Sequence, residues 1–237
     1  MTPLSHPRVP SSQSAPQTSA HDEHHRLAAA VRWIEEFLTG HHPDLGRDGA
    51  VCPYTATSLR RGLMRVVSYD ASAGDSAFLD VVRRLLDELR GAASLLGDEA
   101  IYSASVVVPF GVADPVILGQ IERVQVALKP ECVSQGVMIG EFWPGHAMPG
   151  LHNRAFRPLA TPVPMLAMRH MVLSDLSFLA APHIGPLQQI SYLASYERAM
   201  GARLIGRWRT RWAEALSSAH AAARRAQADP SRPCPTT

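Results

Sequence analysis

Residues 102–110 read Tyr-Ser-Ala-Ser-Val-Val-Val-Pro-Phe, and this stretch decides the fold that we expect. Three valines in a row predict a strand, and Pro109 stands near its end. Asp114-Pro115 follows, which is an N-cap residue and a proline suited to the first helical position. Apolar residues then recur at helical spacing up to Leu128, so we expect a helix that ends before Pro130.

The same reasoning, extended outward, predicts further elements on both sides of this unit. We expect strands over residues 63–69, 137–142 and 165–171. Helices are expected from Leu27 to Gly40, from Asp75 or Ser76 to about Leu89, from Asp175 for a short stretch, and over 187–226 with a break near Gly201 or Gly206. This order favours an α+β fold, with a single sheet of about four strands, helices packed on a face and a long C-terminal helix.

The ends of the chain differ from its middle in composition. Residues 1–21 are rich in Pro, Ser, Thr, Gln and His, and residues 228–237 contain three prolines. We expect both to be disordered tails around a single domain over residues 22–227. No basic segment followed by an apolar stretch is visible at the start, so no secretory signal is predicted and a cytoplasmic protein is expected.

Bulk composition excludes several classes of protein. Three cysteines in 237 residues are too few for a disulfide scaffold. The apolar runs are far shorter than the roughly 18 residues of a membrane span, so an integral membrane protein is not expected. Because 23 basic residues face 21 acidic ones, no nucleic-acid partner is expected from bulk charge.

Basic residues are almost all arginine, because Lys129 is the one lysine in the chain. A codon bias toward arginine and alanine explains this economically. The functional alternative is that some arginines hold an anionic ligand, since the guanidinium is always charged and its planar fork suits carboxylates.

Cys52 is the first candidate for chemistry. It precedes Pro53, which disfavours a helical conformation and presents the thiol from a loop or strand edge. A thiolate there could attack a carbon centre or bind a metal if Arg47 or a helix end lowered its pKa. The alternative is a small buried hydrophobic side chain beside a turn.

A long loop over residues 144–164 is the second candidate, because structureless loops of this length in compact domains are usually functional or disordered. Imidazoles can ligate a metal or carry a proton, but the spacing of His146 and His152 matches no common zinc pattern. Each histidine alone is equally consistent with a surface residue. The loop region carries these candidates: Trp143, His146, His152, Asn153, Arg154, Phe156 and Arg157.

The third candidate is the pair Arg169-His170 at the end of an expected strand. Adjacent strand residues point to opposite faces, so only one of the two faces the core and would need a partner there. The alternative is an edge strand with both side chains partly in solvent. Nucleotide-binding loops, the nucleophile elbow and the common zinc motifs are absent from the sequence.

Parts of the sequence resemble two known families. A run of matching positions resembles the N-terminal signature of the YqcI/YcgG family: Cys52, Tyr54, Leu59, Arg60, Arg61, Gly62, Met64 and Arg65. A second set loosely resembles that family's later signature: Gly140, Pro144, Arg157, Pro164, Leu166 and His170. Residues 136–179 also resemble the uncharacterised DUF6875 family, which is often encoded among natural-product genes and implies no chemistry.

The YqcI/YcgG resemblance implies haem-dependent oxygenase chemistry that hydroxylates a nitrogen of an amino-acid-like substrate. Trp143 replaces the histidine of that family's His-Pro pair, so an iron ligand would have to be His146, His152 or His170. Phe142, Trp143 and Phe156 would then form the walls of the pocket. Carboxylates of the cofactor or substrate would be held by arginines, namely Arg47, Arg154, Arg157 and Arg169.

We therefore expect a small-molecule tailoring enzyme of specialised metabolism, such as antibiotic biosynthesis. The expected reaction type is that of a haem-dependent monooxygenase, which is an oxidoreductase. Its substrate is expected to bear a carboxylate, and Cys52, His152 and His170 are the expected catalytic residues. A cofactor-free cyclase or hydrolase that uses Cys52 or a loop histidine is the first alternative. The second is a non-catalytic partner protein that binds through the C-terminal helix with Trp208 and Trp212, and a homodimer is left open.

Overall fold

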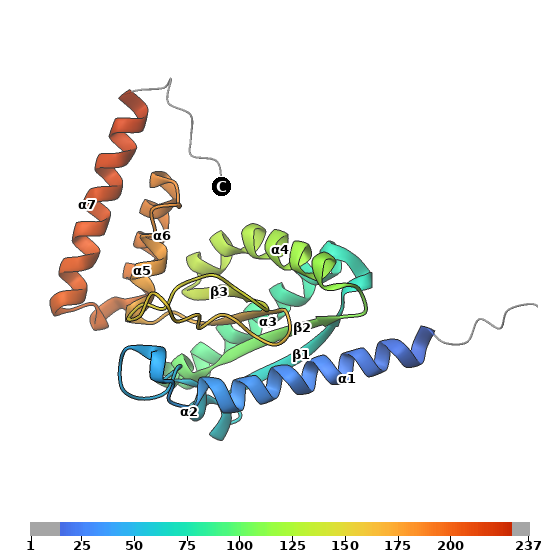
Figure 1. Cartoon of the computed structure of the whole chain (residues 1–237). Coiled ribbons are helices and arrows are strands. Elements are labelled where there is room, and N and C mark those ends of the chain that lie inside the picture. The colour runs from blue at the N-terminus through green and yellow to red at the C-terminus, as the bar shows by residue number, and fades with distance from the viewer. Residues whose placement is uncertain (1–14, 229–237) are drawn as a thin grey trace, which may run out of the picture.

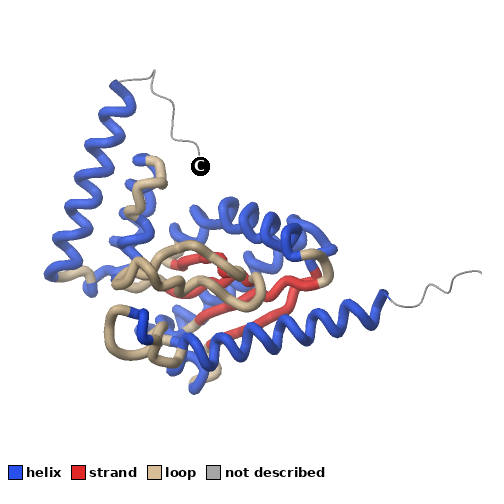
Figure 2. The backbone as a smooth tube through the Cα atoms, viewed as in Figure 1, coloured by secondary structure: helices blue, strands red, loops and turns tan. Residues whose placement is uncertain are grey.

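Four strands form the centre of the protein, whose computed structural model describes residues 15–228. They are β1 (Met64–Asp70), β2 (Ala104–Phe110), β3 (Val137–Phe142) and β4 (Met165–His170), in the sheet order β1-β2-β4-β3. β1 and β2 are parallel, whereas β4 runs antiparallel to both of its neighbours. Figure 2 shows the strands in red among the surrounding helices. The sheet is therefore mixed, and the predicted α+β class is confirmed.

Two long helices cover one face of the sheet. α3 (Gly74–Leu96) is the crossover between the parallel strands β1 and β2, and α4 (Asp114–Ser134) follows β2 directly. Their apolar faces bury Phe78, Val82, Ile117 and Ile121 against the sheet residues Val107, Leu166 and Met168. This is the main core of the protein.

α1 (Ala15–Trp33) covers the other face, with a π-helical turn at Ile34–Leu38 (Figure 1). Ala30 and Ile34 pack there against Val106, Val108 and Met165. Helices thus lie on both faces of the sheet rather than on one. The three successive valines of β2 indicate the same arrangement, because a strand buried on both faces needs apolar residues at successive positions.

The C-terminal helices form an antiparallel pair beside the sheet. α6 (Pro186–Met200) is joined through the short turn Gly201–Arg203 to α7 (Gly206–Ala228), which confirms the predicted break at the two glycines. Figure 1 shows this pair standing away from the sheet, with α7 extending beyond α6. Two short helices, α2 (Thr55–Arg60) and α5 (Leu176–Leu179), complete the described part of the chain.

Two predicted boundaries were wrong. α4 continues through Pro130 to Ser134, although proline removes one helical hydrogen bond, because Cys132 and Val133 beyond it are buried. α1 begins at Ala15 rather than at Leu27, so residues 15–21 of the predicted disordered tail are helical. Asp22 fixes this helix by accepting a hydrogen bond of 3.1 Å from the backbone N–H of Gly111. The predicted tails over residues 1–14 and 229–237 lie outside the described residues.

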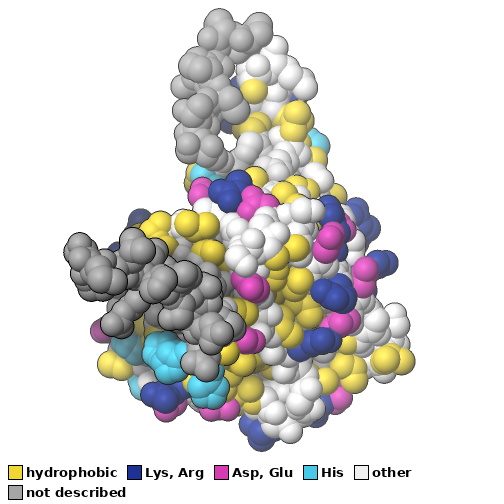
Figure 3. All heavy atoms as spheres, turned by 90° about the vertical axis from the view of Figure 1, so that its right-hand side faces the viewer, with side chains coloured by type: hydrophobic (Ala, Val, Ile, Leu, Met, Phe, Trp, Pro, Cys, Tyr) yellow, Lys and Arg dark blue, Asp and Glu magenta, His cyan; other side chains and the backbone are white. Residues whose placement is uncertain are grey.

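The surface agrees with the near-balanced charge of the chain. On the face seen in Figure 3, acidic and basic side chains are interspersed with apolar ones. Among residues 15–228, no helix combines the length and the apolar character that crossing a membrane requires.

Trp212 holds α7 against α6, since its indole Nε1 donates a hydrogen bond of 3.0 Å to the Leu193 carbonyl. Trp212→Ala removes both this bond and the ring packing, so we expect the free energy of unfolding to fall by about 2–3 kcal/mol. Trp212→Phe keeps most of the packing and should lose only about 1 kcal/mol. Urea unfolding of both variants measures this, and equal losses would show that the hydrogen bond alone matters.

Candidate functional site

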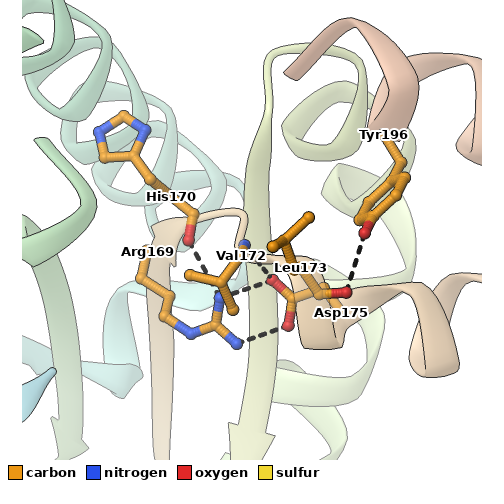
Figure 4. A network of polar contacts seen from close by, with 6 residues as sticks. All are labelled: Arg169, His170, Val172, Leu173, Asp175 and Tyr196. Carbon is orange, nitrogen blue, oxygen red and sulfur yellow. Dashed lines mark hydrogen bonds and ion pairs between the residues drawn. The ribbon is translucent and has the colours of Figure 1, made fainter. Parts of the chain in front are cut away.

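The candidate site lies at the end of the sheet where β4 finishes and β2 and β3 begin. In the strand register Arg169 is opposite Ala104 of β2 and Met138 of β3, while His170 is opposite Val137. The two side chains point to opposite sides of the sheet, as predicted (Figure 4). Arg169 therefore faces the α1 side, and His170 faces α3.

Asp175 is the partner that Arg169 needs on its side of the sheet. Both guanidinium nitrogens Nη1 and Nη2 donate to its carboxylate at 2.7 Å, and the backbone N–H of Val172 donates to the same carboxylate at 2.8 Å (Figure 4). The Asp175 side chain is fully buried, whereas a third of the Arg169 side chain is exposed. Burial lowers the pKa of Arg169, but pairing with Asp175 outweighs burial and leaves that pKa raised.

Tyr196 of α6 fixes the turn between Arg169 and Asp175. Its hydroxyl donates a hydrogen bond of 2.8 Å to the Leu173 carbonyl (Figure 4). Burial raises the pKa of Tyr196 to about 12, so the hydroxyl stays a donor at neutral pH. The segment after β4 is thus held from the sheet by Arg169 and from the C-terminal helices by Tyr196.

Cys52 and Tyr54 approach the same place from the other end of the chain. Burial raises the pKa of Tyr54, and the charges of Arg169, Asp175 and Cys52 act on it as well. The Tyr54 ring lies 6.3 Å, centroid to centroid, from the ring of Tyr102, which precedes β2. Cys52 and Arg169, which the sequence offered as separate candidates, lie near enough for Cys52 to act on the pKa of Arg169.

A groove of two adjoining compartments opens beside this group. The compartment next to Tyr54 has a volume of about 290 Å³, and the compartment next to His170 about 200 Å³. Ile101, Met200 and Arg203 line both, so the two compartments adjoin at these residues. The compartment next to Tyr54 is also lined by Val172, Leu173, Ser174 and Trp208. The compartment next to His170 is also lined by Asp98, Gln135, Met171 and others.

His170 has a defined tautomer in this groove. Its Nε2 lies 3.1 Å from the carbonyl oxygen of Leu89, and a carbonyl can only accept, so Nε2 carries the proton. In the neutral ring Nδ1 is then an acceptor. Burial and the charge of Arg203 lower the pKa of His170, against the opposing effect of the Leu89 hydrogen bond.

His146 lies near the opposite end of β3 from His170, just beyond Trp143. The rings of Trp143 and His146 are 3.9 Å apart, centroid to centroid, and His146 is 5% exposed. Its Nδ1 accepts a hydrogen bond of 3.1 Å from the Met148 N–H, while its Nε2 is buried and has no partner in the described part of the chain. Burial lowers the pKa of this histidine too.

The rest of the long loop packs on the segment after the first helix. Phe156 is buried and lies 4.8 Å from the His42 ring, centroid to centroid. Asn153 donates a hydrogen bond of 2.9 Å from Nδ2 to the Asp44 carbonyl, and the backbone of His152 lies against Gly46. Gly46 has a φ of 75°, so a side chain there would be both strained and crowded. These contacts show why the loop is ordered.

Three of the four arginines predicted to hold a carboxylate are engaged elsewhere, and Arg169 among them is bound to Asp175. Arg47 donates to the carbonyls of residues 48, 50 and 51. Arg157 donates to the carbonyls of Arg154 and Phe156. Sequence analysis missed Arg203, which lines both compartments of the groove, because nothing in its local sequence distinguishes it from other arginines.

The residues predicted to bind haem do not lie around one pocket. His146 and His170 lie near opposite ends of the sheet, and Arg47 and Arg157 are bonded to backbone carbonyls. Within residues 15–228, no three His, Cys, Asp or Glu side chains are grouped as a metal site would need. Haem binding stays a prediction.

Asp175→Asn leaves Arg169 without a countercharge at a site where the carboxylate is fully buried. We expect the free energy of unfolding to fall by about 3 kcal/mol or more. The double variant Arg169→Met with Asp175→Leu removes both charges and should be less destabilised than Asp175→Asn. Chemical denaturation of the three proteins tests this, and a double variant that is the least stable would contradict it.

Acid should destabilise the protein through its buried histidines. The folded-state pKa values of His146 and His170 lie below the ordinary 6.5, so below that pH the unfolded chain binds protons that the folded chain does not. The free energy of unfolding then falls as the pH drops. Urea unfolding at about pH 7.5 and about pH 5.5 measures the loss.

His146→Gln should make that loss smaller, whereas His220→Gln, which changes an exposed residue of α7, should leave it unchanged. Equal losses in both variants would show that His146 is not responsible.

Comparison with known proteins places the chain in a family without supplying an activity. No curated protein and no solved structure matches it. The model of one family, described as a domain of unknown function (DUF6875), matches residues 27–210. This match spans the sheet, the long loop, Arg203 and the first turn of α7. The YqcI/YcgG resemblance is not shown by it. Because the matched region is most of the chain, the protein belongs to the DUF6875 family.

Proposed function

We propose that this protein is a small-molecule enzyme of specialised metabolism that acts on a carboxylate-bearing substrate with its own acid and base groups. The substrate would lie in the groove between Tyr54 and His170. The observation that carries the proposal is the fixed ring of His170, which lines the groove and has its tautomer set by the Leu89 carbonyl.

His170 has the properties of a general base. Its lowered pKa keeps the ring neutral at pH 7, which leaves Nδ1 free to take a proton. The hydrogen bond from Nε2 to a backbone carbonyl orients the ring, as second partners of catalytic histidines do. Within the described residues no hydrogen bond is made to Nδ1, and His170 is half-buried, so Nδ1 is the ring nitrogen left for a ligand.

Arg203 is suited to hold the carboxylate of the substrate. It is exposed and lines both compartments, and its Nη2 donates a 3.2 Å bond to the Ala199 carbonyl. The remaining N–H groups of its guanidinium are available to an anion. The apolar side chains of Ile101 and Met200 would contact the carbon skeleton.

Tyr54 supplies a proton donor on the other side of the groove. Its raised pKa keeps the phenol protonated at neutral pH, and the residue lines the larger compartment. A base and an acid at separate ends of one groove fit a cyclase or a hydrolase. Cys52 does not line the groove in this structure, so it would act as a nucleophile only on a substrate group that reaches past Tyr54.

Two other functions remain as predictions. A haem-dependent oxygenase is the activity that the YqcI/YcgG resemblance implies, but no contact in the structure favours it. A partner protein that binds through Trp208 and Trp212 is less favoured, because Trp212 is already bonded to α6 and Trp208 packs beside it.

The carboxylate site can be tested with matched probes on the full chain. We expect hexanoate to bind in calorimetric titration and hexylamine and hexanol to bind more weakly, because only hexanoate carries the negative charge. Arg203→Gln should weaken hexanoate binding by about tenfold. Arg198→Gln, which changes a neighbouring arginine that donates to Ser195 and does not line the groove, is the control.

Catalysis by His170 needs a separate experiment. The protein is incubated with a small-molecule extract of its natural host, and mass spectrometry identifies compounds that are consumed. His170→Gln should abolish consumption while hexanoate still binds. The proposal would be contradicted if this variant still consumed the compound. It would also be contradicted if the purified protein showed a Soret band and consumed the compound only with its haem bound.

A further inference from the structure

The larger compartment of the groove is lined without any acidic side chain. Tyr54, Ser174 and Arg203 offer hydrogen-bond donors there, and the other lining residues are apolar apart from the indole of Trp208. Asp98 lines only the smaller compartment. A pocket with donors and no carboxylate favours an anion over a cation.

Two further arginines contact Trp208, which lines this compartment. The guanidinium carbons of Arg207 and Arg211 lie 5.4 and 5.2 Å from the centroid of the Trp208 ring. Such cation–π contacts restrict a flexible side chain and so prepare it for a ligand. Arg203, Arg207 and Arg211 are all exposed, and none of them has an ion-pair partner within residues 15–228.

The surrounding charge is strongly positive. Residues 198–228 contain seven arginines and one acidic residue, Glu214, in a chain whose net charge is only +2. Arg209 differs from its neighbours, because it pairs with Glu197 at 3.0 Å and lies over Trp212 instead. Arg207 and Arg211 are one turn apart on the same helix, a spacing at which like charges repel and a shared anion would relieve the repulsion.

We propose that Trp208, Arg203, Arg207 and Arg211 form an anion site for the phosphate or diphosphate group of an organic ligand. One guanidinium is enough for a carboxylate, whereas two or three match the higher charge and the several oxygens of a phosphate. The hydroxyls of Tyr54 and Ser174 would supply further donors. This site shares Arg203 with the proposed carboxylate site and so rests on that part of the proposed function. It does not depend on His170, so it is tested separately from the proposed acid–base chemistry.

The test is a calorimetric titration of the full chain with inorganic pyrophosphate. We expect binding that weakens as salt is added, and a loss of about tenfold in affinity for the double variant Arg207→Gln with Arg211→Gln. Glutamine keeps the helix propensity close to that of arginine, so α7 should stay folded, which circular dichroism checks.

The matched control is Arg224→Gln with Arg225→Gln, which removes the same charge from the far end of the same helix. It should retain nearly all of the affinity. An equal loss in the control pair would mean diffuse attraction by α7 and would overturn the proposal. Absence of pyrophosphate binding to the unchanged protein would overturn it as well.

Two more titrations separate this site from its neighbours. Malonate, a dicarboxylate, should bind more weakly than pyrophosphate, and equal affinities would contradict a site for phosphate. His170→Gln should bind pyrophosphate as the unchanged protein does, even if the same substitution abolishes catalysis.

Discussion

The groove of this protein depends on the buried ion pair between Arg169 and Asp175. The carboxylate of Asp175 accepts three hydrogen bonds, two from Arg169 and one from the Val172 N–H, and it is fully buried. Burial of a charge is unfavourable unless it is paired and hydrogen-bonded, so this geometry leaves the segment after β4 little freedom. That segment forms a wall of both compartments, with Met171 in one and residues 172–174 in the other.

The opposite wall is carried by the C-terminal helices, which the same segment holds in place. Tyr196 of α6 is bonded to the Leu173 carbonyl, and Trp212 of α7 is bonded to the Leu193 carbonyl of α6. Met200, Arg203 and Trp208 lie at the junction between these helices and line the groove. A weaker Arg169–Asp175 pair would therefore alter both walls of the groove at once.

Much of the fold could be predicted because its signals are local. The valines of β2, the apolar spacing of α4 and the glycines at 201 and 206 each specify an element from a few residues. The extension of α4 through Pro130 could not be foreseen, since it depends on the burial of Cys132 by other elements.

The candidate site was harder to predict than the fold, because it also depends on contacts between distant parts of the chain. His170 was identified by its place in a strand, whereas Arg47 and Arg157 were chosen for their sequence neighbours and proved to bind backbone carbonyls. Arg203 is brought to the groove only by the packing of α6.

The two compartments differ in a way that gives the groove a direction. The compartment of Trp208 presents hydrogen-bond donors, and Trp208 itself contacts two arginines that have no ion-pair partner within residues 15–228. The other is lined by the exposed residue Asp98 and by His170, whose Nδ1 is an acceptor. Arg203 stands between them. A ligand with an anionic end and a hydrogen-bond-donating end can satisfy both compartments in only one orientation, because reversing it would place its anion against Asp98. The donor end would then lie against His170, the residue that we propose as the base.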